Sequence, residues 1–304
     1  MGVKGLRAQT FASDVQALCG NDLEYQLDPY HGNLTKASVL STSGVNITSF
    51  RADPATGIFT FTSVSLTNYK GFGTITVKFT LGRNTYEVEL KVIECCVNPM
   101  TYDHIFIDET IPSGSYTGIV FMYGTNTVAG SVTFDMAEVK LATDAEIVVP
   151  SGTELIVDQS DLTKLCEYAW DRIYVEDNQA AVEFISSTLS ESLRGVYTED
   201  GGQVSASSTV FSNNVMSLYI NNHNGSGPYS GSYIEYNNCD FTFSRFMTPM
   251  NIHSSSPINM QNYLNQTCET GADVLHVLIE NSSGVKLGDQ SLTNNEFFNG
   301  SGYG

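Results

Sequence analysis

The sequence predicts an all-β protein in which a β-sandwich is followed by a right-handed parallel β-helix. In the first third of the chain, short alternating runs recur at roughly ten-residue spacing, with Gly, Asn and Pro between them. Residues 171–241 then repeat one pattern three times with a period in the low twenties, which is the length of one solenoid coil. Only 15% of the residues are charged, and the abundant Ser, Thr, Asn, Gly, Tyr and Phe favour turn-rich β structure.

Five alternating runs predict the strands of the sandwich. Alternation places apolar side chains on one face of a strand and polar side chains on the other. Strands this short, with turn residues between them, are typical of a β-sandwich. The runs lie at 23–27, 43–50, 57–66, 73–81 and 85–94.

Cys19-Gly20-Asn21 precedes the first run, and the segments GTITVKFTL and YEVELKV form the last two. In these features the region resembles the Ig-like modules of large secreted proteins from Bacteroidota. The resemblance implies an Ig-like sandwich over 19–97, preceded by an N-terminal extension over 1–18. The Pro-containing segment that starts at Val97 predicts a junction over 98–115. The core Trp that such a module carries after its first strand is missing from this sequence.

Three tyrosines mark the repeat: Tyr174, Tyr197 and Tyr219 follow one another at nearly equal intervals along the sequence. Equivalent residues of successive β-helix coils stack roughly 4.8 Å apart. The tyrosines are therefore predicted to form a ladder. The residues after them predict a second ladder, made of Val175, Thr198 and Ile220.

The central repeat also predicts how one coil is built. Its inward anchors are expected to be Val196, Val204 and Phe211, with Gly201-Gly202 at a corner. Asn213-Asn214 are expected to belong to an Asn ladder, because stacked amides can bond along a coil corner and tolerate its left-handed backbone. By the same pattern, 130–162 is expected to contain only very short strands.

The element WDRIYV, from Trp170 to Val175, precedes a coil that runs from Arg194 to Asn214 and ends in two asparagines. This arrangement resembles the right-handed β-helix segments of secreted and surface proteins of Bacteroidota, many of them exported by the type IX secretion system. Arg172 stands where that pattern usually has Gly. The resemblance implies a β-helix, assigned to 116–304, and a secreted or cell-surface location. The open end of the β-helix is expected either to continue in further coils beyond the chain given or to contact another subunit.

The net charge of -19 excludes the classes of protein that bind phosphate-rich surfaces. Nucleic acid and anionic membranes need a basic face, so neither is expected as a partner. No run of 18 apolar residues predicts membrane insertion. The N-terminus has no apolar core for a secretory signal, and the chain is expected to be a processed form or a segment of a longer protein.

The cysteines show neither the CxxC pairs nor the histidine spacing of a zinc site. If the chain is secreted, a disulfide between Cys19 and either Cys95 or Cys96 is plausible. The six lie at 19, 95, 96, 166, 239 and 268.

Two acid pairs occupy equivalent positions in successive coils, Glu176-Asp177 and Glu199-Asp200. Stacked like charges destabilise a sheet unless they are solvated or bridged. A hydrated turn meets this requirement, and so does a calcium ion, which binds six to eight oxygen ligands. Calcium is the one cofactor that the sequence leaves open.

Aromatic residues supply the other candidate binding site. Trp170 could stack on a sugar ring or anchor the core of the repeat. Tyr229, Tyr233 and Tyr236 lie in an Asn/Gly/Ser-rich stretch that makes the third coil longer than its neighbours. Insertions of this kind emerge from one face of a solenoid, often the binding face.

The functional hypothesis is a non-enzymatic secreted or cell-surface protein with a structural or adhesive role. No catalytic residue is assigned, because no clustered carboxylates of the kind used for glycoside hydrolysis are visible. The expected partners are other copies of the chain, further domains of a larger surface protein, or glycans, and a filament fits the open ends of a β-helix. The alternative is a carbohydrate-binding or polysaccharide-degrading β-helix protein.

Overall fold

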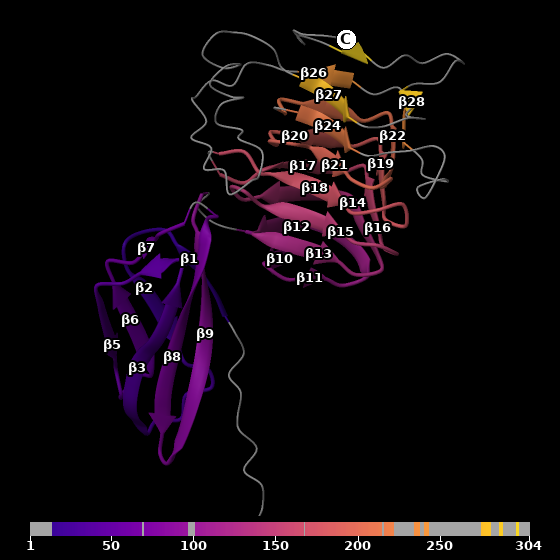
Figure 1. Cartoon of the computed structure of the whole chain (residues 1–304). Coiled ribbons are helices and arrows are strands. Elements are labelled where there is room, and N and C mark those ends of the chain that lie inside the picture. Colours follow the sequence, from indigo (N-terminus) through magenta and orange to yellow (C-terminus); the bar gives the residue numbers. More distant parts are fainter. Residues whose placement is uncertain are drawn as a thin grey trace, which may run out of the picture. The chain divides into compact units, whose positions relative to one another are not determined.

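The computed structural model describes residues 14–68, 70–96, 101–166, 168–214 and 216–221, and then five strands within 234–297. From Ile220 onward only the backbone is described. All regular structure in these residues is strand, and none of it is a helix that could cross a membrane. The chain divides into two units, Met1–Met100 and Thr101–Gly304 (Figure 1).

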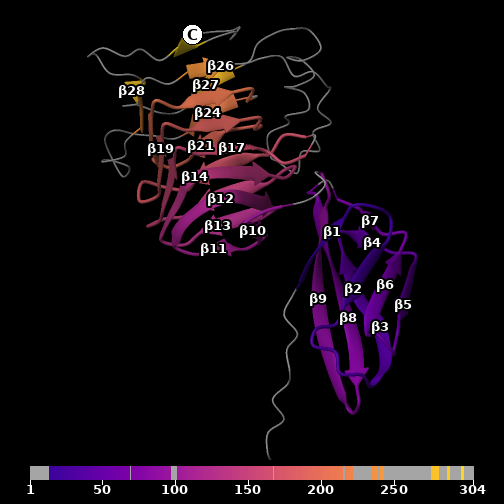
Figure 2. The same ribbon diagram turned by 180° about the vertical axis from the view of Figure 1, so that it is seen from behind.

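The described residues of the first unit form three sheets (Figures 1 and 2). The strand pairs described in this unit are antiparallel except one, in which β1 runs parallel to β9. The four-stranded sheet has the order β1 (Asp14–Leu18), β9 (Asn84–Glu94), β8 (Phe72–Leu81) and β3 (Leu34–Ser43). The three-stranded sheet has the order β2 (Leu23–Gln26), β6 (Ile58–Thr62) and β5 (Ser49–Ala52), and β4 (Val45–Asn46) pairs with β7 (Ser65–Leu66).

The sheets of the first unit share one apolar core. On β8 the apolar residues Ile75, Val77 and Phe79 are buried, and the polar residues between them face outward. Phe59, on β6, packs edge-on against Phe79 with the ring centroids 5.6 Å apart. The alternation of the sequence is therefore the alternation of burial, as expected for half-buried strands.

A disulfide joins Cys19, directly after β1, to Cys95, directly after β9. The two cysteines are separated by 76 positions in the sequence, so the crosslink closes most of the first unit into one loop. A crosslink of this kind stabilises mainly by restricting the unfolded chain.

We expect the double variant Cys19→Ala/Cys95→Ala to lose about 2 to 4 kcal/mol of unfolding free energy in the first unit. Urea unfolding followed by circular dichroism measures this loss as a lower midpoint. The variant Cys19→Ser/Cys95→Ser is the control for the apolarity of the new side chains. A loss below roughly 1 kcal/mol in both variants would contradict the expectation.

The second unit is a parallel β-helix. Every described strand pair in it is parallel, and successive coils add strands to the same sheets. The seven-stranded sheet has the order β11 (Thr110–Ile111), β13 (Thr125–Val128), β15 (Glu146–Val149), β18 (Arg172–Val175), β21 (Val196–Thr198), β24 (Met216–Asn221) and β27 (Leu275–Glu280).

The other sheet of the β-helix has thirteen strands and two arms that meet at β14 (Ser131–Leu141). β12 (Gly114–Tyr123) pairs with β14 on one side and with β10 (His104–Ile107) on the other. One arm continues through β16 (Glu154–Asp158), β19 (Ala181–Ile185), β22 (Gln203–Ser207), β25 (Ile234–Asn237) and β28 (Lys286–Leu287). The other continues through β17 (Asp161–Lys164), β20 (Thr188–Ser190), β23 (Val210–Ser212), β26 (Asp240–Thr242) and β29 (Glu296–Phe297).

The two arms separate at a bend within β14. Its first half pairs with β16, its second half with β17, and Met136 between them has a positive φ of 49°. The register against β12 shifts at the same place, between Tyr116 and Gly118. The expectation of only very short strands over 130–162 is therefore wrong for β14, because one left-handed residue turns the chain without ending the strand.

The same corner recurs in later coils with a polar residue in the left-handed position. The residue that follows this left-handed position has a buried hydroxyl, which at Ser160 and Ser187 accepts a hydrogen bond from the backbone of the preceding coil. The Ala137 N–H donates to Ser160 Oγ at 2.8 Å, and the Ser160 N–H donates to Ser187 Oγ at 3.1 Å. These hydroxyls satisfy backbone donors at the inside of the bend. The left-handed positions are Met136, Gln159, Ser186 and Ser208, and the buried hydroxyls after them are Ser160, Ser187 and Thr209.

The predicted inward anchors Val196, Val204 and Phe211 are all buried, and Gly201 has a left-handed backbone at a corner. Asn214 is also buried, but the residue one coil below it is Ser192 rather than another asparagine. The Ser192 N–H and hydroxyl both donate to Asn214 Oδ1, at 3.0 and 2.7 Å. In these two coils, the expected Asn ladder is therefore a Ser–Asn pair.

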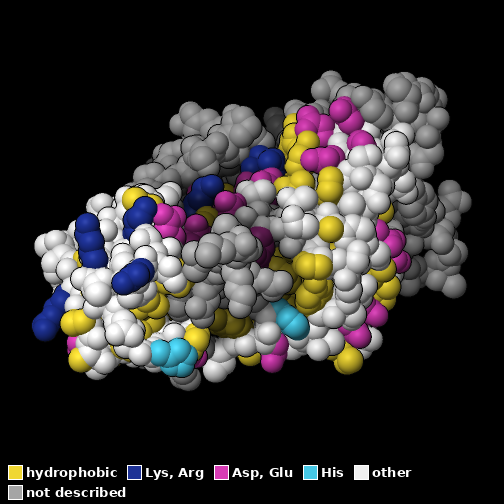
Figure 3. All heavy atoms as spheres, turned by 90° about the horizontal axis from the view of Figure 1, so that it is seen from below, with side chains coloured by type: hydrophobic (Ala, Val, Ile, Leu, Met, Phe, Trp, Pro, Cys, Tyr) yellow, Lys and Arg dark blue, Asp and Glu magenta, His cyan; other side chains and the backbone are white. Residues whose placement is uncertain are grey.

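β10 and β11 begin inside the range 98–115, which the sequence assigns to a junction, and pair with β12 and β13 of the β-helix. Figure 3 shows one face of the molecule, where uncharged polar side chains and backbone predominate and basic side chains are sparse. That surface agrees with the low content of charged residues in the chain.

Candidate binding face

The tyrosine ladder lies on the seven-stranded sheet. Tyr174 of β18 pairs with Tyr197 of β21, which pairs with Tyr219 of β24. Consecutive ring centroids are 5.4 and 4.7 Å apart. The register also stacks Val175, Thr198 and Ile220, so both predicted ladders are confirmed.

Charged side chains run beside the tyrosines. The Arg172 guanidinium lies over two rings, 4.8 Å from the centroid of Tyr174 and 4.9 Å from that of Tyr197. Its Nε–H donates to the carboxylate of Glu146, one coil below. Contacts of a guanidinium with an aromatic face and with a carboxylate are both favourable, and together they fix the side chain.

A second arginine is buried in the same cluster. The Arg194 guanidinium binds Asp171 through two hydrogen bonds, from Nε at 2.8 Å and from Nη2. It lies 5.7 Å from the ring centroid of Tyr197, and Arg194 is only 1% exposed. Its Nη1 is fully buried and has no hydrogen-bond acceptor.

We call this cluster the tyrosine–arginine face. It comprises Glu146, Asp171, Arg172, Tyr174, Arg194, Tyr197, Glu199 and Tyr219. Its members come from adjacent strands of one sheet and the corners beside them.

Glu199 connects the face to one of the predicted acid pairs. The Tyr174 hydroxyl donates to Glu199 Oε2 at 2.9 Å. The pKa of Tyr174 is raised, first because burial disfavours the phenolate and next because Glu199 accepts the phenol proton and repels the phenolate. Tyr174 is therefore held in its neutral form.

The raised pKa of Tyr174 predicts a loss of stability in alkali. Its contribution is fully present below about pH 10, the pKa in the unfolded chain, and is lost as the pH rises above that value. We expect Tyr174→Phe to flatten the decline in unfolding free energy above about pH 10, because the variant has no phenol to ionise on unfolding. Urea midpoints measured at a series of alkaline pH values test this. An unchanged slope would contradict it.

The four acids that the sequence offers as a calcium site do not converge. Among the residues described, no three of Glu176, Asp177, Glu199 and Asp200 bring ligand oxygens together. The Asp177 carboxylate accepts from the Gln179 N–H at 2.9 Å, as in a hydrated turn, and Glu199 accepts from Tyr174. Calcium therefore stays a prediction without a preformed ligand set.

Trp170 belongs to the core of the β-helix. Its side chain is fully buried, and its indole N–H donates to the Ser190 carbonyl oxygen at 2.7 Å. A ring with no exposed surface cannot stack on a sugar, so the core-anchor interpretation of the sequence applies. Tyr229 and Tyr233 lie outside the described residues, and Tyr236 is described only as backbone, paired with Ala206 of β22.

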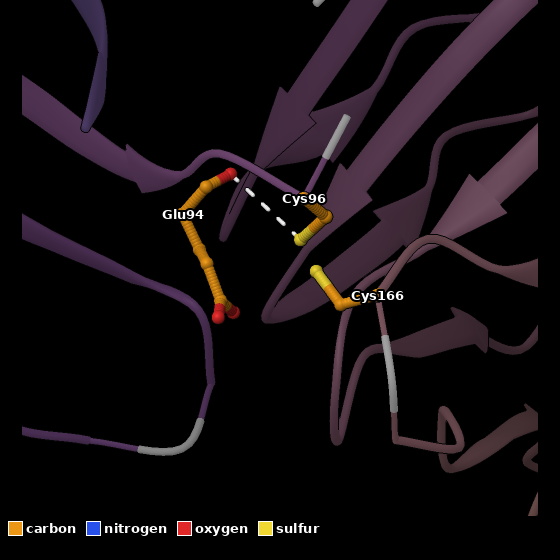
Figure 4. A group of neighbouring side chains, drawn as sticks. All are labelled: Glu94, Cys96 and Cys166. Atoms are coloured by element: carbon orange, nitrogen blue, oxygen red, sulfur yellow. Dashed lines mark hydrogen bonds between the residues drawn. The ribbon is translucent and has the colours of Figure 1, made fainter. Parts of the chain in front are cut away.

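Figure 4 shows three residues with potential metal-ligand atoms, Glu94 and Cys96 of the first unit and Cys166 of the second. Cys96 and Cys166 are both disulfide-bonded, so neither sulfur is the thiolate that zinc or copper binds. Cys96 Sγ lies 4.0 Å from the Glu94 carbonyl oxygen, and a disulfide sulfur carries no proton to donate there. No metal centre is assigned to these residues.

The chain matches no protein-family model, no curated protein and no solved structure. The resemblance to Bacteroidota surface proteins gains no support from these comparisons and stays an interpretation of the sequence.

Sequence reasoning missed the ion pairs of the tyrosine–arginine face. A signal was present, because Asp171 and Arg194 are separated by the same sequence interval as Tyr174 and Tyr197. Opposite charges one coil apart predict a pair that bridges the coils. The pair formed by Glu146 and Arg172 carries no such signal, since the coil between them is longer.

Proposed function

We propose that this chain is a non-enzymatic secreted or cell-surface protein whose rigid β-helix has a structural or adhesive role. The observation that carries the proposal is the unbroken parallel register of the seven-stranded sheet. Each coil holds its outward side chains in line with those of the previous coil. Such a rod displays side chains at fixed spacing without any moving part.

Cysteine chemistry supports a location outside the cytoplasm. Cys19 and Cys95 form a disulfide, and Cys96 and Cys166 are also oxidised. Disulfides persist in oxidising compartments and are rare in the cytosol. Export by a type IX system from a member of the Bacteroidota, and assembly with other copies or with further domains of a larger surface protein, remain parts of the proposal.

Two finer features of the fold also belong to the proposal. For the first unit we propose an Ig-like sandwich, supported by the parallel pairing of β1 with β9 among otherwise antiparallel strands. Its disulfide joins the ends of those two strands rather than the two sheets, which departs from the antibody pattern. For the β-helix we propose a right-handed course, because crossovers between parallel strands are right-handed in nearly all proteins.

The location of the chain on its source cells tests the proposal. We expect antibodies against the first unit to label intact cells, and Cys19 and Cys95 to resist alkylation until a reductant is added. Recovery only from the cytoplasm, with both cysteines alkylatable, would contradict it. Enzymatic activity would also contradict the proposal. It would be detected as new reducing ends or unsaturated products released from a panel of polysaccharides, in an activity that is abolished by replacing an acid of the β-helix.

A further inference from the structure

The tyrosine–arginine face departs from what the β-helix requires. In the two preceding coils, the positions that pair below Tyr174 are Val148 and Thr127, residues that suit a partly exposed strand. In the next coils the sheet carries tyrosines and two arginines that are held by carboxylates. The fold alone does not account for this change.

One part of this change is unfavourable for stability. Arg194 is 1% exposed and its Nη1 has no acceptor, and a buried donor without a partner is destabilising. Natural proteins tend to break local rules of this kind at functional sites. The unpaired donor lies in the guanidinium beside the Tyr197 ring, so it belongs to the face.

The chemistry of the face matches a carbohydrate better than a protein or an ion. The partly exposed rings of Tyr174 and Tyr197 offer apolar surface for the C–H face of a sugar. Glu146 and Glu199 can accept hydrogen bonds from hydroxyl groups, and Arg194 can donate one once its side chain turns outward. Arg172 and Tyr174 are fixed by their mutual contact, and such preorganisation favours binding, whereas Arg194 has to change its rotamer to reach a ligand. The centroid spacings of 5.4 and 4.7 Å repeat along the coil axis, which suits a linear ligand.

The charges of the face select a neutral ligand. Three carboxylates, those of Glu146, Asp171 and Glu199, oppose the two guanidinium groups of Arg172 and Arg194. Each arginine is already paired with an acid. The excess negative charge, in a chain of net charge -19, repels an acidic polysaccharide.

We propose that the tyrosine–arginine face binds a linear neutral oligosaccharide, which lies along the coil axis with one sugar ring on Tyr174. A ligand oxygen becomes the acceptor for Arg194 Nη1, which a side-chain rotamer change exposes, as is common on binding. The inference rests on the proposed adhesive role and gives that role a ligand class.

Isothermal titration calorimetry of the whole chain tests the inference, with cellohexaose, xylohexaose, maltohexaose and laminarihexaose as neutral probes and hexagalacturonate as the acidic probe. Each titration is run with calcium and with EDTA. We expect at least one neutral probe to bind, in either condition, and hexagalacturonate to bind at least about tenfold more weakly, which corresponds to roughly 1.4 kcal/mol.

Variants locate the site. Tyr174→Ala and Arg194→Lys are expected to weaken binding of the neutral probe about tenfold or more. Tyr174→Phe keeps the ring and is expected to retain binding. The matched control is Tyr86→Ala, a partly buried tyrosine on β9 of the first unit. Melting curves identify any variant that fails to fold. If Arg194→Lys fails to fold, the comparison of Tyr174→Ala with Tyr174→Phe decides, and if Tyr174→Ala fails, Arg194→Lys decides.

Three results would overturn the inference: no binding of any neutral probe, preferential binding of hexagalacturonate, or unchanged affinity in folded Tyr174→Ala. None of them contradicts a structural role at the cell surface. Cleavage of a bound probe would instead contradict the non-enzymatic proposal while leaving the location of the site intact.

Discussion

Replacing Asp171 with alanine is expected to lower the unfolding free energy of the β-helix by about 3 to 5 kcal/mol. Asp171 holds Arg194 through two hydrogen bonds, and the Arg194 side chain is 2% exposed. Without the carboxylate a buried positive charge is left with no counter-charge. Urea unfolding followed by tryptophan fluorescence measures the loss, because Trp170 is the only tryptophan of the chain and lies in this unit.

The double variant Asp171→Leu/Arg194→Met separates the cost of the uncompensated charge from the net contribution of the ion pair to stability. Replacing both members of a buried pair by apolar residues of similar size is often neutral or stabilising. We therefore expect the double variant to recover most of the stability that Asp171→Ala loses. A double variant as unstable as Asp171→Ala would mean that packing, and not the uncompensated charge, determines the loss.

Trp170→Ala, as a single variant, is expected to lower the unfolding free energy of the β-helix by about 3 to 5 kcal/mol. The indole is fully buried in the β-helix core, and its N–H donates to the Ser190 carbonyl oxygen. Alanine leaves a cavity and an acceptor without its donor. Because the variant has no tryptophan, circular dichroism is the readout of its urea midpoint.

Trp170→Phe is the control, since it refills most of the volume but cannot make the hydrogen bond. Its expected loss is smaller than that of Trp170→Ala, and the difference reports the cavity. Equal losses in both variants would show that the hydrogen bond matters more than packing at this position. A negligible loss in both would contradict the placement of Trp170 in the core.

The sequence predicted the tyrosine ladder because that part of the repeat is regular. Tyr174, Tyr197 and Tyr219 occupy the same strand position in coils of nearly equal length. The partnership of Arg172 with Glu146 was not predictable, since their separation of 26 positions differs from the period of the repeat. A period is visible in sequence only where coil length is constant, whereas contacts depend on strand register.

Other elements were hidden for different reasons. β3 has exposed or half-buried residues at all positions after Leu34, so it shows no clear alternation of burial to detect. The bend at Met136 carries no glycine to mark it, although its φ is 49°. The corners at Ser160 and Ser187 carry neither Gly nor Asn to mark them, and each hydroxyl donates to a backbone carbonyl two residues earlier.

The pairing of β24 with β27 shows that this fold tolerates long inserted segments between paired strands. Leu218 pairs with Val196 on one side and with Val277 on the other, and the connection to Val277 is more than twice as long as the connection to Val196. By loop-closure entropy, the longer connection costs only about 1 kcal/mol more than the shorter one. Segments could therefore be inserted between coils, by evolution or by design, while the strands keep their register. The connections of the β-helix could in this way change independently of its core.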